Sequence, residues 1–130
     1  MDRDTPWDTD AAVLAAVEHL IESALRRQTW LFALDEEQRG VAAVAIDGVP
    51  VDPDPEDVEQ FAGSVRLLLE QAEAESVVVV WERAGGPDLA MQEADWAAAV
   101  AASGAPVRAQ LVAHDHGVRL LDPAFEAIVA

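Results

Sequence analysis

Ser76-Val77-Val78-Val79-Val80-Trp81 is the stretch that decides the fold, because it is an unbroken apolar run of β-branched and aromatic residues. Such a run is typical of a strand that is buried on both faces, usually a central strand in a sheet covered by helices. Apolar residues at helical spacing occupy the segments on either side, up to about Glu75 and again over residues 89–102. This pattern predicts crossover helices on a mixed sheet and therefore an α/β layered domain.

The N-terminal part predicts a helix followed by a β-hairpin. Thr9 or Asp10 caps the helix, which we expect to close at Arg26 and Arg27, where cations suit the negative end of the helix dipole. Residues 28–34 and 41–46 then read as two strands joined by a polar turn. Residues 1–8 are polar and predict a flexible acidic arm.

The C-terminal part adds the remaining elements. A second helix starts at Asp54-Pro55, with the aspartate as N-cap and the proline at the first helical position. After the third helix, a second hairpin is expected around the turn at residues 114–117, and a short helix over residues 124–129. The order α-β-β-α-β-α-β-β-α predicts a single three-layer α-β-α domain with a mixed sheet, spanning residues 9–130.

Composition excludes several classes of function. The chain has 130 residues, 25 acidic side chains, eight arginines and no lysine, for a net charge of −17. A nucleic-acid binder that neutralises phosphates needs a basic face, and an anionic membrane would repel this charge, so we expect neither partner. No stretch approaches the ~20 apolar residues of a membrane span and no secretory signal is present, which predicts a cytoplasmic protein. The acidity fits solubility or a halophilic source.

The chain lacks the motifs of several enzyme classes. It contains no cysteine, which excludes disulfides, thiolate zinc sites and cysteine nucleophiles. It has no P-loop, no G-x-G-x-x-G, no H-E-x-x-H and no G-x-S-x-G. A cytidine deaminase would share the predicted order of elements, but it needs H-x-E and P-C-x-x-C at the starts of two helices. Deaminase chemistry is therefore excluded.

Order and spacing between Gln28 and Leu121 resemble the JAB/MPN (Mov34) metalloprotease fold, within its bacterial RadC-like branch. In that branch an apolar strand ends in the zinc motif H-x-H-P-S-G, followed by S-x-x-D. The corresponding residues here are Trp81-Glu82-Arg83-Ala84-Gly85-Gly86, followed by Asp95. Gly104 and the hairpin that contains Gly117 fit the end of the family pattern. The resemblance covers most of the chain.

The departures from that pattern imply a fold relative without the metal site. The two zinc-binding histidines of the family fall on Trp81 and Arg83, and neither indole nor guanidinium binds a metal. The family's serine falls near Met91 or Gln92, and of the ligands only Asp95 remains. The resemblance implies a degenerate pocket and no cofactor. That pocket consists of Trp81, Glu82, Arg83, Gly85, Gly86 and Asp95, with an ion pair between Arg83 and Asp95 across it.

Three hypotheses of function follow. The first is a non-catalytic domain that binds a protein partner or forms a homodimer. The second is a metal-dependent hydrolase with its site relocated to the His114-Asp115-His116 turn, helped by Asp95, although such residues also suit an ordinary hairpin turn. The third is a small-anion site at Arg83 and the Gly85-Gly86 pair. Glu82 has nothing obvious to activate as a general base.

Overall fold

The computed structural model describes residues 5–21 and 26–121, and it confirms a mixed α/β fold. The sheet has five strands in the order β2-β1-β3-β4-β5, with β3 and β4 parallel and every other neighbouring pair antiparallel. The elements in chain order are α1 (Asp10–Leu20), β1 (Gln28–Leu34), β2 (Gly40–Ile46), α2 (Pro55–Ala72), β3 (Ser76–Glu82), α3 (Met91–Ala102), β4 (Val107–His114) and β5 (Gly117–Leu120).

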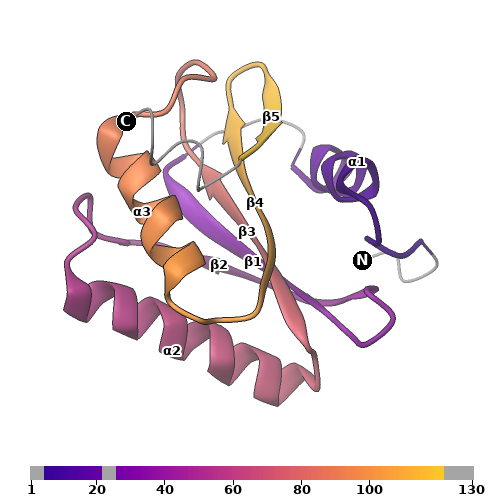
Figure 1. Ribbon diagram of the computed structural model, residues 1–130. Coiled ribbons are helices and arrows are strands. Elements are labelled where there is room, and N and C mark those ends of the chain that lie inside the picture. Colours follow the sequence, from indigo (N-terminus) through magenta and orange to yellow (C-terminus); the bar gives the residue numbers. More distant parts are fainter. Residues whose placement is uncertain (1–4, 22–25, 122–130) are drawn as a thin grey trace.

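Helices cover both faces of the sheet, with α1 on one side and α2 and α3 on the other (Figure 1). The four valines of β3 are fully buried, as expected for a central strand. Val78 and Val80 pack with α1, whereas Val77 and Val79 pack with α2 and α3. Alternate residues of a strand point to opposite faces, so the valine run supplies the middle of two cores at once.

The first helix is shorter than the sequence predicts. The Thr9 hydroxyl caps it by accepting a hydrogen bond from the Ala12 amide at 3.1 Å, and the helix ends at Leu20. The expectation that Arg26 and Arg27 close this helix is wrong, because both lie in a bend directly before β1. Arg26 instead reaches across to Asp47, with 2.6 Å between Nη2 and Oδ1. Residues 22–25 lie outside the described residues.

The prediction of a flexible arm over residues 1–8 is wrong at Trp7, whereas residues 1–4 lie outside the described residues. The indole of Trp7 is 3% exposed and lies 5.7 Å from the ring of Phe32. The backbone amide of Trp7 donates to the carbonyl of Gln38 at 2.7 Å, which ties this segment to the β1–β2 turn. A buried aromatic side chain gains enough from leaving water to hold a terminal segment in place.

In the second half of the chain, the observed elements agree closely with those predicted from the sequence. Helix α2 begins with Asp54 as N-cap and Pro55 in its first turn, as predicted. Strands β4 and β5 form the expected hairpin, and Gly117 adopts a φ of 141° after the turn. The predicted C-terminal helix over residues 124–129 lies outside the described residues. None of the helices in the described part of the chain combines the length and apolar character that crossing a bilayer requires.

Candidate functional site

A cleft of about 240 Å³ lies over one face of the sheet at the carboxyl end of β3. Its floor is a row of three neighbouring side chains, because Thr29 of β1 pairs with Ile46 of β2 on one side and with Trp81 of β3 on the other. The segment between β2 and α2 and the beginning of α3 form its walls. The lining residues are Arg27, Gln28, Thr29, Ile46, Gly48, Val49, Val51, Trp81, Glu82, Arg83, Ala90, Gln92, Glu93 and Trp96.

Trp81 belongs to an aromatic cluster beside the cleft. Its ring centroid lies 5.5 Å from that of Phe61 and 5.8 Å from that of Trp96. The indole N–H donates to Oε1 of Gln110 at 3.0 Å. Gln110 is buried, and its amide donates in turn to the carbonyl of Ala97 at 2.8 Å. Trp81 therefore links β3 to β4 and, through Gln110, to α3.

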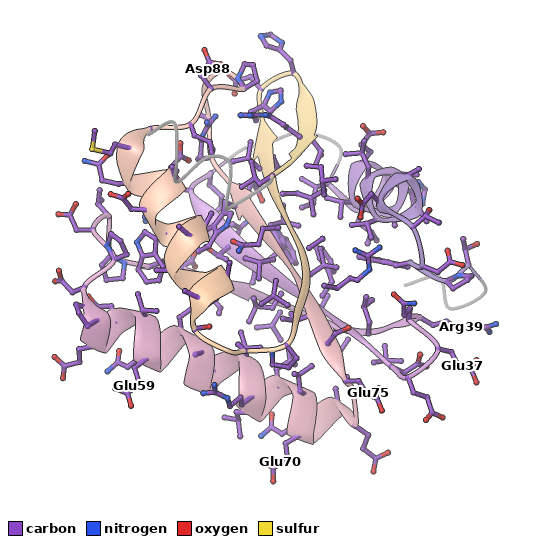
Figure 2. The ribbon with its side chains drawn as sticks, in the orientation of Figure 1. Glu37, Arg39, Glu59, Glu70, Glu75 and Asp88 are labelled. Carbon is purple, nitrogen blue, oxygen red and sulfur yellow. The ribbon has the colours of Figure 1, made fainter. Side chains whose placement is uncertain are left out.

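Arg83 fixes the loop after β3 to the start of α3. Its guanidinium forms a bidentate ion pair with the Glu93 carboxylate, in which Nε donates to Oε2 at 2.8 Å and Nη2 donates to Oε1 at 3.3 Å. It also donates to two backbone carbonyls of the loop, that of Asp88 at 2.8 Å and that of Gly86. The two side chains are 15% and 24% exposed, so solvent screens this pair only partly. Figure 2 labels Asp88 in this loop.

The expected ion pair between Arg83 and Asp95 is wrong, because Glu93 takes the role that we predicted for Asp95. The Asp95 side chain is exposed and does not line the cleft. Two residues on a helix differ by about 200° in direction, so Glu93 and Asp95 cannot face the same cleft. Glu93 also accepts from the Ala90 amide at 2.9 Å. A glutamate three residues after a helix N-cap was the available sequence signal for this residue.

The carbonyls of the glycine pair in the same loop both accept hydrogen bonds from within the protein. The carbonyl of Gly85 accepts from the Asp115 amide at 2.9 Å, and the carbonyl of Gly86 accepts from Arg83. An anion site would need N–H groups aimed at one point and a cation that is not already paired. The geometry therefore gives the small-anion hypothesis at Arg83, Gly85 and Gly86 no support.

Glu82 holds the beginning of β1 against β3. The residue is 4% exposed, and Oε1 accepts from the side-chain amide of Gln28 at 2.9 Å and from the Trp30 indole at 2.8 Å. Oε2 lies 3.4 Å from the backbone nitrogen of Arg26. A buried carboxylate that accepts several N–H groups is a structural anchor.

The His114-Asp115-His116 turn combines one buried residue with two exposed ones. His114 is buried, and its Nδ1 accepts from the His116 amide at 3.2 Å. The two imidazole centroids are 6.5 Å apart, and Asp115 and His116 are exposed. Across the described residues, no three histidine, cysteine, aspartate or glutamate side chains are grouped so that they could hold a metal ion. The metal-site hypothesis gains no support from this turn.

Comparison with known proteins leaves the site to be interpreted from its own geometry. No protein-family model matches this chain, and no curated protein matches it.

Proposed function

We propose that this chain is a non-catalytic, cytoplasmic α/β domain that pairs with a second copy of itself through strand β2. In this proposal it is a JAB/RadC-like domain in which the metal-binding positions have become structural. The roles of Trp81 and Arg83 support the non-catalytic part. Trp81 packs among aromatic rings, and Arg83 bonds the loop after β3 to the start of α3, so both residues stabilise the fold.

The edge strand β2 carries the proposal of self-association. Its seven residues, Gly40–Ile46, contain no charge and no proline, and Ala43, Val44 and Ala45 are exposed. In the sheet order β2 has only β1 as a neighbour, so its outer side presents backbone groups to an added strand. The opposite edge, β5, is only four residues long and includes Arg119. Proteins usually protect an exposed edge with charges or a short strand, and β2 has neither protection.

Charges at the two ends of β2 favour a second copy of this chain as the occupant. Arg39 directly precedes the strand and Asp47 directly follows it. An antiparallel pairing centred on Ala43 places Arg39 of each copy opposite Asp47 of the other. Arg39 lies 3.5 Å from Glu37 within its own copy (Figure 2), and Asp47 pairs with Arg26. The pairing across the interface exchanges these exposed ion pairs for intermolecular ones. A two-fold interface is self-complementary in this way.

The test measures oligomeric state by sedimentation of the full chain. We expect a dimer, and we expect Val44→Lys to give a folded monomer, because a lysine on an edge strand opposes strand addition. Leu67→Lys is the matched control, since Leu67 is an exposed apolar side chain on α2. Arg39→Glu and Asp47→Arg should each weaken the dimer, and the double variant should restore it. A monomeric parent protein, or a double variant that stays monomeric, would overturn the proposal.

Elemental analysis tests the non-catalytic part separately. Protein purified without chelators should carry no stoichiometric zinc, manganese or iron. Stoichiometric metal that is lost when His114 and His116 are both changed to alanine would instead favour the hydrolase hypothesis. This result would not affect the β2 interface, so the two parts of the proposal can fail independently.

A further inference from the structure

A threonine hydroxyl without a partner lies in the floor of the cleft. Thr29 is 3% exposed, and it stands in the middle of the row formed with Ile46 and Trp81. Among the described residues, no protein group hydrogen-bonds this hydroxyl, and the buried side-chain nitrogen or oxygen without a partner is Nε of Arg39, so the Thr29 oxygen is open to the cleft. The side chains beside it are an aliphatic group and an indole, which offer no compensation. The hydroxyl is therefore free to hydrogen-bond a molecule that enters the cleft.

The charges around the cleft are balanced before any ligand enters. Arg83 is paired with Glu93, and the Glu82 carboxylate already accepts from Gln28 and Trp30. Arg27 is exposed, with its Nη2 3.5 Å from the carbonyl of Pro50. The whole molecule carries a charge of −17, which repels anions at long range. An uncharged ligand fits this balance better than an ion of either sign.

The size and walls of the cleft favour one flat ring. Trp81 and Trp96 supply two indoles whose planes differ by 46°, and Ile46, Val49 and Val51 supply aliphatic surface. The volume is about 240 Å³. A dry apolar cavity of about 150 Å³ is enough for benzene, so the cleft can hold a substituted six-membered ring. Aromatic walls add favourable offset or edge-to-face contacts to such a ring.

We propose that this cleft is a binding site for a small, uncharged aromatic molecule of the phenol class, with its hydroxyl hydrogen-bonded to Thr29. The ring packs between the two indoles and the aliphatic wall. The site lies on the α2 and α3 face of the sheet, so it goes beyond self-association through β2 and does not depend on it.

The experiment titrates ¹⁵N-labelled full-length protein with phenol and, separately, with toluene, which has a similar shape but no hydroxyl. The indole N–H signals of Trp81 and Trp96 report on the cleft. Trp7, on the opposite face of the sheet, is the internal control. We expect saturable shifts of Trp81 and Trp96 with phenol, tighter than with toluene, and no shift of Trp7.

Variants of Thr29 separate the hydrogen bond from the shape of the cleft. Thr29→Val keeps the volume and should weaken phenol binding by about five- to tenfold without changing toluene binding. Thr29→Ser should retain the affinity for phenol. Ser64→Ala is the control, because that hydroxyl bonds to the Gln60 carbonyl on α2, outside the cleft. Thr29→Val removes an unpaired hydroxyl, so it should also fold normally.

Four results would overturn the proposal. They are the absence of a saturable shift with phenol, equal affinities for phenol and toluene, an unchanged phenol affinity in Thr29→Val, and tighter binding of benzoate or benzylammonium than of phenol. The Val44→Lys variant should bind phenol like the parent protein, which keeps the cleft and the β2 interface distinguishable.

Discussion

At the scale of single residues, Arg83 and Trp81 both stabilise the fold through hydrogen bonds. The guanidinium of Arg83 donates to a carboxylate and to two loop carbonyls, and the indole of Trp81 donates to the buried Gln110. Sequence reasoning placed both residues at one pocket, and both do line one cleft. It chose the wrong acidic partner, because the direction of a helical side chain depends on where the helix begins.

Replacing Arg83 by methionine should lower the free energy of unfolding by about 2–3 kcal/mol, because Glu93 and two loop carbonyls lose a charged donor. Urea unfolding measures this loss as a lower midpoint with an unchanged slope. Arg66→Met is the control, since Arg66 is exposed on α2, and it should change stability by less than about 0.5 kcal/mol. If both variants lose the same free energy of unfolding, the contacts of Arg83 do not stabilise the protein.

At the scale of elements, local patterns predicted the strands better than the ends of the helices. The valine run of β3 specifies a strand without reference to the rest of the chain, and β4 and β5 form the hairpin that was predicted around residues 114–117. Helix α1 stops at Leu20 although apolar residues at helical spacing continue to Leu25. Arg26 and Arg27 follow in a bend, and Arg26 pairs with Asp47. This long-range contact is invisible to helical periodicity.

Helix α2 ends on a residue in an unfavourable conformation, which gives a prediction at this scale. Glu73 has φ 53° and ψ 43°, a left-handed geometry that costs a side chain about 1 kcal/mol or more and costs glycine nothing. Glu73→Gly should therefore stabilise the protein by about 0.5–1 kcal/mol, measured as a higher melting temperature.

Glu70→Gly is the matched control for this prediction. Glu70 lies in the last turn of the same helix, is exposed, and has a right-handed helical backbone (Figure 2). Glycine at that position should cost about 1 kcal/mol. A loss of stability in both variants would show that the conformation of Glu73 is not strained.

At the scale of the whole molecule, the net charge of −17 opposes both folding and association. The Debye length falls from about 30 Å at 0.01 M salt to about 3 Å at 1 M, so added salt screens this repulsion. We therefore expect the free energy of unfolding and the fraction of dimer both to rise with sodium chloride.

Chemical denaturation of the Val44→Lys variant at several salt concentrations isolates the effect on folding from that on association. Potassium chloride should act like sodium chloride, because screening does not depend on the ion. A stability that falls as salt is added would mean that local ion pairs such as Arg83–Glu93 outweigh the general repulsion.

The amino-acid sequence alone determined the α/β class, the central position of β3 and the acidity of the molecule, because these follow from local periodicity and composition. Only the tertiary structure placed β2 at the edge of the sheet. Only the tertiary structure decided that Glu93 and not Asp95 meets Arg83, and that Thr29 stands between Ile46 and Trp81. Those contacts join segments far apart in the chain. They depend on the phase of a helix and on the register between strands, and a shift of one residue reverses which side of a strand is buried.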